Sequence, residues 1–213
     1  VFFVSSNPSL LRYARLDQIG LSYQAMSLDR SIQNISFIKK LPPTAGMGFA
    51  LLRAATTNIE GKNEMNEYTE TFSSQEIQAI LSFGLALSNR LALGINIKMF
   101  YQNISSEFES TNNIGLDFGF LYKINRSLLL GGIYENINGG YNWKLDHANY
   151  EELFPKIVKI GLTYTGIKHI TICFQEDMLI SPSDYINYRS RLGLEYHFSK
   201  GIKLRGGMKF SNK

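Results

Sequence analysis

The sequence predicts an all-β protein built as an antiparallel, up-and-down transmembrane β-barrel, with about eleven strands in this chain. Three observations lead to this fold class. Apolar residues alternate with small or polar ones along most of the 213 residues, which is the period of a β-strand. The connections between the alternating runs are short and long in turn. The chain has no run of about 18 apolar residues, so a transmembrane helix is excluded.

The clearest unit is the hairpin over residues 77–101, which reads IQAILSFGLALSNRLALGINIKMFY. Its odd positions are mostly large and apolar, and its even positions are mostly small or polar. The two arms meet at the polar turn Ser88-Asn89-Arg90. Each arm has about the length, roughly 9–11 residues, that a tilted strand needs to cross a bilayer. The hairpin therefore predicts one unit of a membrane-facing wall.

The first part of the chain is an irregular segment over residues 1–15, and the predicted barrel strands fill residues 16–213. Asn7-Pro8-Ser9 is a turn or cap signal, and a short helical turn is predicted after it. We interpret residues 1–213 as a single barrel domain. The sequence lacks an initiator Met and predicts an odd number of strands, whereas bacterial single-chain barrels have even numbers. We therefore expect it to be a fragment.

The strands follow in order, and their connections alternate in length. Three runs precede the hairpin 77–101, and Pro42-Pro43 ends the second because proline cannot donate to a ladder. Three further hairpins follow it. The short connections are 39–43, 88–90, 124–126, 165–168 and 199–201, and the long ones are 58–74, 103–112, 138–155 and 179–187. The link 27–30 is the one short exception on the long side. This pattern predicts periplasmic short turns and outside-facing long loops.

The two faces of the strands differ in chemistry. The apolar face ends in Tyr or Phe at many strand ends, as expected at bilayer interfaces. A soluble β-sandwich is the alternative, but its strands would be shorter. The other face is predicted to line the lumen. Its candidate residues are Lys98, Asp117, Lys123, Glu135, Lys159, Arg189, Arg191, Glu195, Lys203 and Arg205, together with Asp177, His197 and Lys209. This face predicts either a hydrated, salt-bridged interior or a lumen biased toward anions.

The composition excludes several classes of function. The net charge of +4 comes from scattered basic residues without a patch, so nucleic acid is not an expected partner. Cys173 is the single cysteine, and His147, His169 and His197 share no metal-ligand spacing. No nucleophile, phosphate-loop or dinucleotide motif is present. We therefore expect no enzymatic activity, no metal and no cofactor.

Several stretches resemble the FadL-like outer-membrane proteins, in particular their PorV/PorQ branch. VFFVSSNPSLL, with Asn7 and Pro8, is similar to the "WNPAGLA" segment of that group, although Ser9 and Leu11 stand where Ala and Gly are usual. LSNRLALGINIKMFYQ, IGLDFGFLYKINRSLLLGGIYENIN and FPKIVKIGLTY resemble further segments in the same order. The glycine-rich stretch before the NP motif and the end of the barrel have no counterpart in the sequence. The resemblance implies a bacterial outer-membrane barrel of about fourteen strands.

The resemblance also implies two functions, neither of them catalytic. Barrels of the FadL group carry hydrophobic compounds inward, whereas the PorV branch serves type IX protein secretion. Membrane lipids are the expected partners, with hydrophobic small molecules under the first hypothesis and secretion-system proteins and cargo under the second. Under the transport hypothesis an apolar ligand is expected to contact Ile80, Leu121, Leu129 and Ile133. A soluble β-rich binding module and a purely structural barrel are the alternatives.

Overall fold

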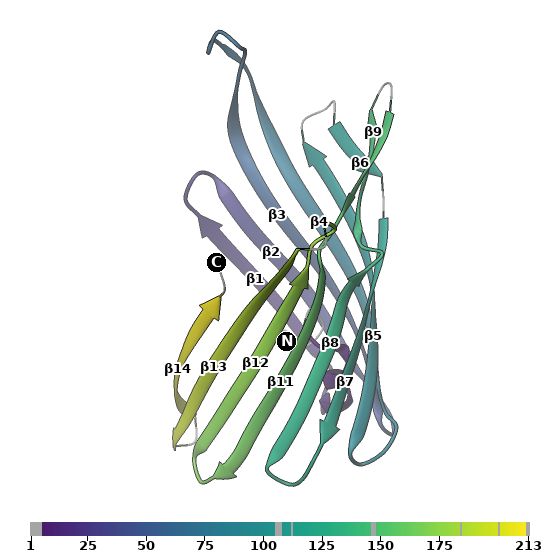
Figure 1. Cartoon of the computed structure of the whole chain (residues 1–213), viewed down its shortest axis with the longest axis vertical. Coiled ribbons are helices and arrows are strands. Elements are labelled where there is room, and N and C mark those ends of the chain that lie inside the picture. Colours follow the sequence, from purple (N-terminus) through teal and green to yellow (C-terminus); the bar gives the residue numbers. More distant parts are fainter. Residues whose placement is uncertain are drawn as a thin grey trace.

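The computed structural model describes residues 6–104, 108–111, 113–145, 148–183, 185–199 and 201–211. Eleven long strands form one antiparallel sheet in which each strand pairs with the next along the chain. They are β1 (Gln18–Met26), β2 (Arg30–Leu41), β3 (Ala45–Lys62), β4 (Tyr68–Ala86), β5 (Leu91–Ile104), β7 (Asn113–Lys123), β8 (Leu128–Ile137), β11 (Lys156–Ile167), β12 (Ile170–Ile180), β13 (Ile186–Ser199) and β14 (Ile202–Ser211). The strands lean in one direction and the sheet curls (Figure 1). The predicted fold class is therefore confirmed.

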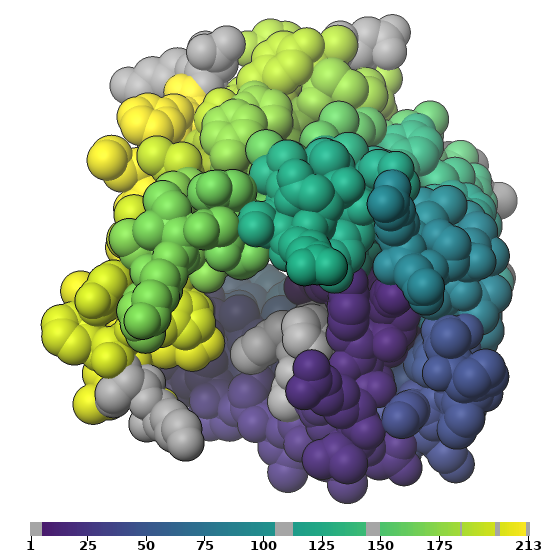
Figure 2. Space-filling view, turned by 90° about the horizontal axis from the view of Figure 1, so that it is seen from below, coloured from purple at the N-terminus to yellow at the C-terminus, as the bar shows by residue number. Residues whose placement is uncertain are grey.

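Seen from below, the strands follow one another around a hollow (Figure 2). The short helix η1 (Pro8–Tyr13) packs against one face of the curled sheet, which we call the inner face. On the opposite, outer face the side chains are large, apolar and exposed, as at Phe83, Leu93 and Ile97, which are 43%, 43% and 41% exposed. Exposed rows of this kind on a strand of transmembrane length are typical of a lipid-facing wall.

The helical turn predicted after Asn7 is confirmed as η1, a six-residue 3-10 helix. Asn7 is its N-cap, and Pro8 occupies the first turn, where a missing backbone donor costs nothing. Helix η1 contacts β2, β3, β4, β5 and β7. The η1 part of the irregular segment thus lies inside the curl of the sheet.

The long connections contain more strand than the sequence predicts. β3 and β4 continue into the 58–74 connection, to Lys62 and from Tyr68, and project as a two-stranded ribbon (Figure 1). Three short strands, β6 (Phe108–Thr111), β9 (Gly140–Leu145) and β10 (Ala148–Leu153), occupy the 103–112 and 138–155 connections. They pair with one another and with the end of β5. β6 and β10 show no apolar alternation, so the periodicity criterion could not detect them. In β9 the residues Tyr141, Trp143 and Leu145 do alternate with polar ones, but this six-residue run lies within a connection that is predicted to be a loop.

Among the described residues, no helix is long and apolar enough to cross a membrane.

Candidate functional site

A row of glycines makes the seat of η1 on the inner face. Gly46, Gly84, Gly94 and Gly119 are successive register partners across β3, β4, β5 and β7. A Cβ atom at any of them would overlap η1 or its cap, mostly at backbone atoms of residues 8–11. Because glycine has no side chain, the helix backbone lies directly on the backbone of the sheet. The seat is therefore shaped for a chain segment rather than for side chains.

Asn7 attaches η1 to the far side of this seat. Its Nδ2 donates to the carbonyl oxygens of Phe120 (3.2 Å) and Gly132 (3.0 Å), which belong to paired residues of β7 and β8. Its Oδ1 accepts from the backbone N–H (3.0 Å) and the hydroxyl (2.6 Å) of Ser9. All the hydrogen-bonding capacity of the amide is directed into the structure, so Asn7 both caps the helix and holds it to two strands.

A small apolar cluster holds the other end of η1. Leu11 is fully buried and packs with Ile38, Ala50 and Ile80 of β2, β3 and β4. Ile80, one of the predicted ligand contacts, therefore lies in this cluster. Arg12 at the end of η1 donates to the carbonyl of Ser88 in the short β4–β5 turn (3.4 Å). Helix η1 consequently lies near the short-turn end of the sheet.

A polar row crosses the inner face one inward-facing position beyond the glycine row. The Ser82 hydroxyl donates to Asn96 (2.6 Å), whose amide donates to Asp117 (2.8 Å). Lys98 forms an ion pair with the same carboxylate at 2.8 Å. Lys98 and Asp117 are only 7% and 1% exposed. Charges so deeply buried are tolerated because each has a charged partner and further hydrogen bonds.

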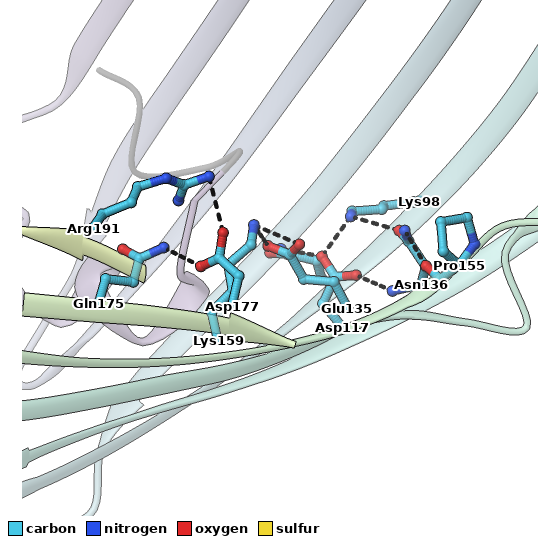
Figure 3. Close-up of polar contacts among 10 residues, drawn as sticks. Lys98, Asp117, Glu135, Asn136, Pro155, Lys159, Gln175, Asp177 and Arg191 are labelled. Carbon is cyan, nitrogen blue, oxygen red and sulfur yellow. Dashed lines mark hydrogen bonds and ion pairs between the residues drawn. The ribbon is translucent and has the colours of Figure 1, made fainter. Parts of the chain in front are cut away.

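Asp117 also takes part in the backbone pairing of β7 and β8. The ladder between these strands shifts register between Leu116 and Phe118. At this break the Asp117 carboxylate accepts the backbone N–H of Asn136 at 3.0 Å (Figure 3). Asn136 has a φ of 62°, and its side chain donates to the Pro155 carbonyl (3.1 Å). The buried carboxylate thus replaces a ladder hydrogen bond and fixes an irregularity in the wall.

A pocket of about 440 Å³ lies beside η1 on the inner face of β7, β8, β11, β12 and β13. Its apolar lining comes from Leu10, Leu121, Leu129 and Ile133. Its polar lining includes Glu135, Lys159, Thr163, Gln175 and Arg191, with Ser6 and Asn7. Three of the four positions at which a ligand contact is predicted therefore line one pocket. A volume of this order is typical of sites for small organic molecules.

Ion pairs neutralise the charged wall of the pocket. Lys159 contacts both carboxylate oxygens of Glu135, at 2.8 and 2.6 Å. Arg191 pairs with Asp177 at 2.9 Å, and Gln175 donates to the other oxygen of Asp177 at 2.6 Å. Figure 3 shows these side chains directed toward one another along the inner face. Asp177 itself is 1% exposed and lies behind the pocket lining.

The remaining predicted lumen residues lie apart from the pocket. Glu195 pairs with Lys203 (3.1 Å), His197 (2.7 Å) and Arg205. Lys203 and Arg205 are exposed on β14, and Lys123 is exposed at the short-turn end of β7. Arg189 faces Asp177 in register, but Asp177 pairs with Arg191 instead. His147 lies outside the described residues, and the lumen-facing role of the whole set stays a prediction.

An aromatic cluster lies on the inner face at the long-loop end. Phe100 of β5 makes edge contacts with Tyr141 of β9 and with Phe154. Trp143 stands beside Tyr141 and donates to Glu152 (3.1 Å). Burial raises the pKa of Tyr141 above its ordinary value, and the nearby carboxylate of Glu76 raises it further. The cluster packs the 138–155 connection against the end of the sheet.

Sequence reasoning did not identify several residues of this site. Gln175 and Asn96 are polar residues on the predicted inner face, and their strand parity could have identified them. The seat of η1 depends on which glycines become register partners, which a single strand pattern does not reveal. Among the described residues, no group of three or more His, Cys, Asp or Glu side chains could hold a metal ion.

Comparison with known proteins identifies solved structures that share this fold. The chain is similar to the Pseudomonas putida toluene transporter TodX, with a TM-score of 0.71 at 12% identity over 97% of this chain and 78% of that one. It is also similar to the monoaromatic hydrocarbon channel CymD, with a TM-score of 0.68 at 11% identity over 99% of this chain and 78% of that one. No protein-family model and no curated protein sequence matches the chain. The likeness shows the fold of a transmembrane β-barrel, while membership of the PorV/PorQ branch stays a prediction.

Proposed function

We propose that this chain is part of a bacterial outer-membrane barrel that admits hydrophobic small molecules through its interior, without catalysis. The observation that carries the proposal is the pocket beside η1. Its lining combines four large apolar side chains with polar groups, a mixture that is found in sites for small organic ligands. The outer face exposes large apolar side chains along transmembrane-length strands, which supports a lipid environment.

The solved structures with this fold support the same direction. TodX is described as a toluene transporter and CymD as a monoaromatic hydrocarbon channel. We extend the class of ligand to this chain because its own pocket offers Leu121, Leu129 and Ile133 to an apolar molecule. The secretion hypothesis rests on the sequence resemblance alone, and no described contact favours it.

Filling the pocket tests this function. Gly161 lines the pocket, and a Cβ atom there would make only ordinary contacts, the nearest at 3.5 Å. Gly161→Leu should therefore fill the pocket without disturbing the strands. Gly193→Leu is the matched control, since Gly193 has similarly loose surroundings and lies outside the pocket lining.

The measurement is uptake of radiolabelled butylbenzene by Gram-negative cells that express the full-length protein and lack their own channel for hydrophobic compounds. We expect the protein to accelerate uptake, Gly161→Leu to reduce that acceleration by at least about fivefold, and Gly193→Leu to preserve it. Equal uptake with and without the protein would contradict the proposed function. Unchanged uptake by Gly161→Leu would remove the pocket from the pathway.

A further inference from the structure

The polar wall of the pocket has a defined chemistry that an apolar ligand does not use. Glu135 directs both carboxylate oxygens to Lys159, and Asp177 directs its two oxygens to Arg191 and Gln175. Two cations therefore face two anions, and the wall is neutral as a unit. A carboxylate ligand would meet this wall next to two existing carboxylates. Its desolvation would not be offset by an unpaired cation among the described lining residues.

Two hydrogen-bonding groups on this wall remain available. Gln175 and Arg191 are direct register partners on β12 and β13, and both line the pocket. Gln175 uses its amide N–H toward Asp177, and its Oε1 has no partner among the described residues. Arg191 uses one terminal nitrogen toward the same carboxylate and retains further N–H donors. An acceptor and several donors thus stand side by side.

From this arrangement we infer that the pocket prefers apolar molecules that carry a single uncharged hydroxyl, such as alkylphenols or alcohols. A hydroxyl donates one hydrogen bond and accepts others, so it complements Gln175 Oε1 and the Arg191 N–H groups together. The hydrocarbon part then lies against Leu10, Leu121, Leu129 and Ile133. The inference rests on the proposed function, because it names the substrate class of the same pocket.

Specificity of this kind follows from the cost of unpaired polar groups. A plain hydrocarbon would exclude water from Gln175 and Arg191 and leave their hydrogen bonds unreplaced. A hydroxyl would replace those hydrogen bonds. A carboxylate would suffer repulsion from Glu135 and Asp177. The expected order of affinity is therefore phenol above hydrocarbon above carboxylate.

The test uses three ligands with one skeleton, butylbenzene, 4-butylphenol and 4-butylbenzoate, and the full-length protein in detergent at pH 7.5. At this pH the phenol is neutral and the benzoate is charged. We expect calorimetry to show 4-butylphenol binding about threefold to tenfold more tightly than butylbenzene, and butylbenzoate at least about tenfold more weakly than the phenol. Gln175→Leu should abolish the advantage of the phenol and preserve butylbenzene binding, which also reports that the variant is folded.

Two controls and a second variant complete the experiment. Gln78→Leu makes the same change on the inner face outside the pocket and should leave the preference intact. Glu135→Gln leaves Lys159 without its carboxylate partner and should strengthen butylbenzoate binding about fivefold or more, whereas Glu195→Gln, away from the pocket, should not.

The results distinguish a failure of the hydroxyl preference from a failure of the proposed function. Butylbenzoate binding as tightly as the phenol would overturn the inference, and so would a phenol preference that survives Gln175→Leu. In both cases bound butylbenzene would leave the proposed function standing. Binding of none of the three ligands would overturn the proposed function and the inference with it.

Discussion

The side-chain amide of Asn7 donates to the carbonyl oxygen of Gly132 at 3.0 Å, joining residues 125 positions apart in the sequence. The same nitrogen donates to Phe120 on the neighbouring strand. Because the pocket lies beside η1 and is lined by both Asn7 and Gly132, this contact sets one of its boundaries.

Asn7→Ala should loosen η1 from the sheet. It removes the helix cap, worth about 1 kcal/mol, and two further hydrogen bonds worth about 1 kcal/mol each. Asn7→Asp keeps an acceptor for Ser9 but places a carboxylate against two carbonyl oxygens, so it should be at least as damaging. Limited proteolysis of the N-terminal segment checks both. If the N-terminal segment of Asn7→Asp resisted proteolysis as well as that of the natural protein, the role of the amide donor would be contradicted.

Gly94→Ala tests the glycine seat. The added methyl group would overlap the backbone of Pro8 and Ser9, so either η1 or β5 must shift. We expect a loss of about 1–3 kcal/mol in the free energy of unfolding, together with faster proteolysis of the N-terminal segment. Gly206→Ala on β14 is the control, because a Cβ atom there has no neighbour within 4 Å. Equal stability of the two variants in urea would show that the seat is not tight.

Asp117→Ala should be the most damaging single change in the polar row. It leaves Lys98 buried without its partner and removes the acceptor for the Asn136 N–H. We expect the free energy of unfolding to fall by about 3–5 kcal/mol, as measured by urea unfolding of the protein refolded in lipid vesicles. The double variant Asp117→Ala with Lys98→Met should recover part of this loss, because no buried charge remains. A double variant less stable than Asp117→Ala alone would refute the ion-pair explanation.

Substitutions on the two faces of the sheet should differ sharply. Ile97 is exposed on the apolar outer face of β5. Ile97→Arg should therefore lower the free energy of unfolding in a bilayer by about 2–4 kcal/mol. Thr163 lines the inner pocket, where Thr163→Lys can reach water, and it should cost less than about 1 kcal/mol. Folding titrations into vesicles compare the two. Equal costs would contradict the assignment of the outer face to lipid.

Much of the wall could be predicted from the sequence because its signal is local. Alternation along the hairpin 77–101 identified both strands, their turn and the face on which Lys98 lies. In the projecting ribbon, neither β3 beyond Thr57 nor the start of β4 has an apolar face. The strand structure there therefore left no periodic signal in the sequence.

The site itself depends on register and on contacts between distant segments. The odd–even alternation along each strand placed Glu135 and Lys159 on one face of the sheet. Which charged residues form ion pairs, however, depends on how far neighbouring strands are displaced relative to one another. Asp177 faces Lys159 and Arg189 in register and nevertheless pairs with Arg191. The NP motif predicted a cap, whereas its attachment to Gly132 required knowing that β7 and β8 lie beside η1.

The most direct test of the account asks whether a hydrophobic molecule occupies the pocket. In a Cys173→Ser background, Leu129→Cys places a lone thiol in the pocket lining, and Lys209→Cys places one on β14 away from it. The measurement is the rate of alkylation by a water-soluble maleimide with and without saturating butylbenzene. The account predicts that butylbenzene slows alkylation at position 129 by at least about fivefold and leaves the rate at position 209 unchanged. Equal rates at position 129 with and without butylbenzene would contradict it.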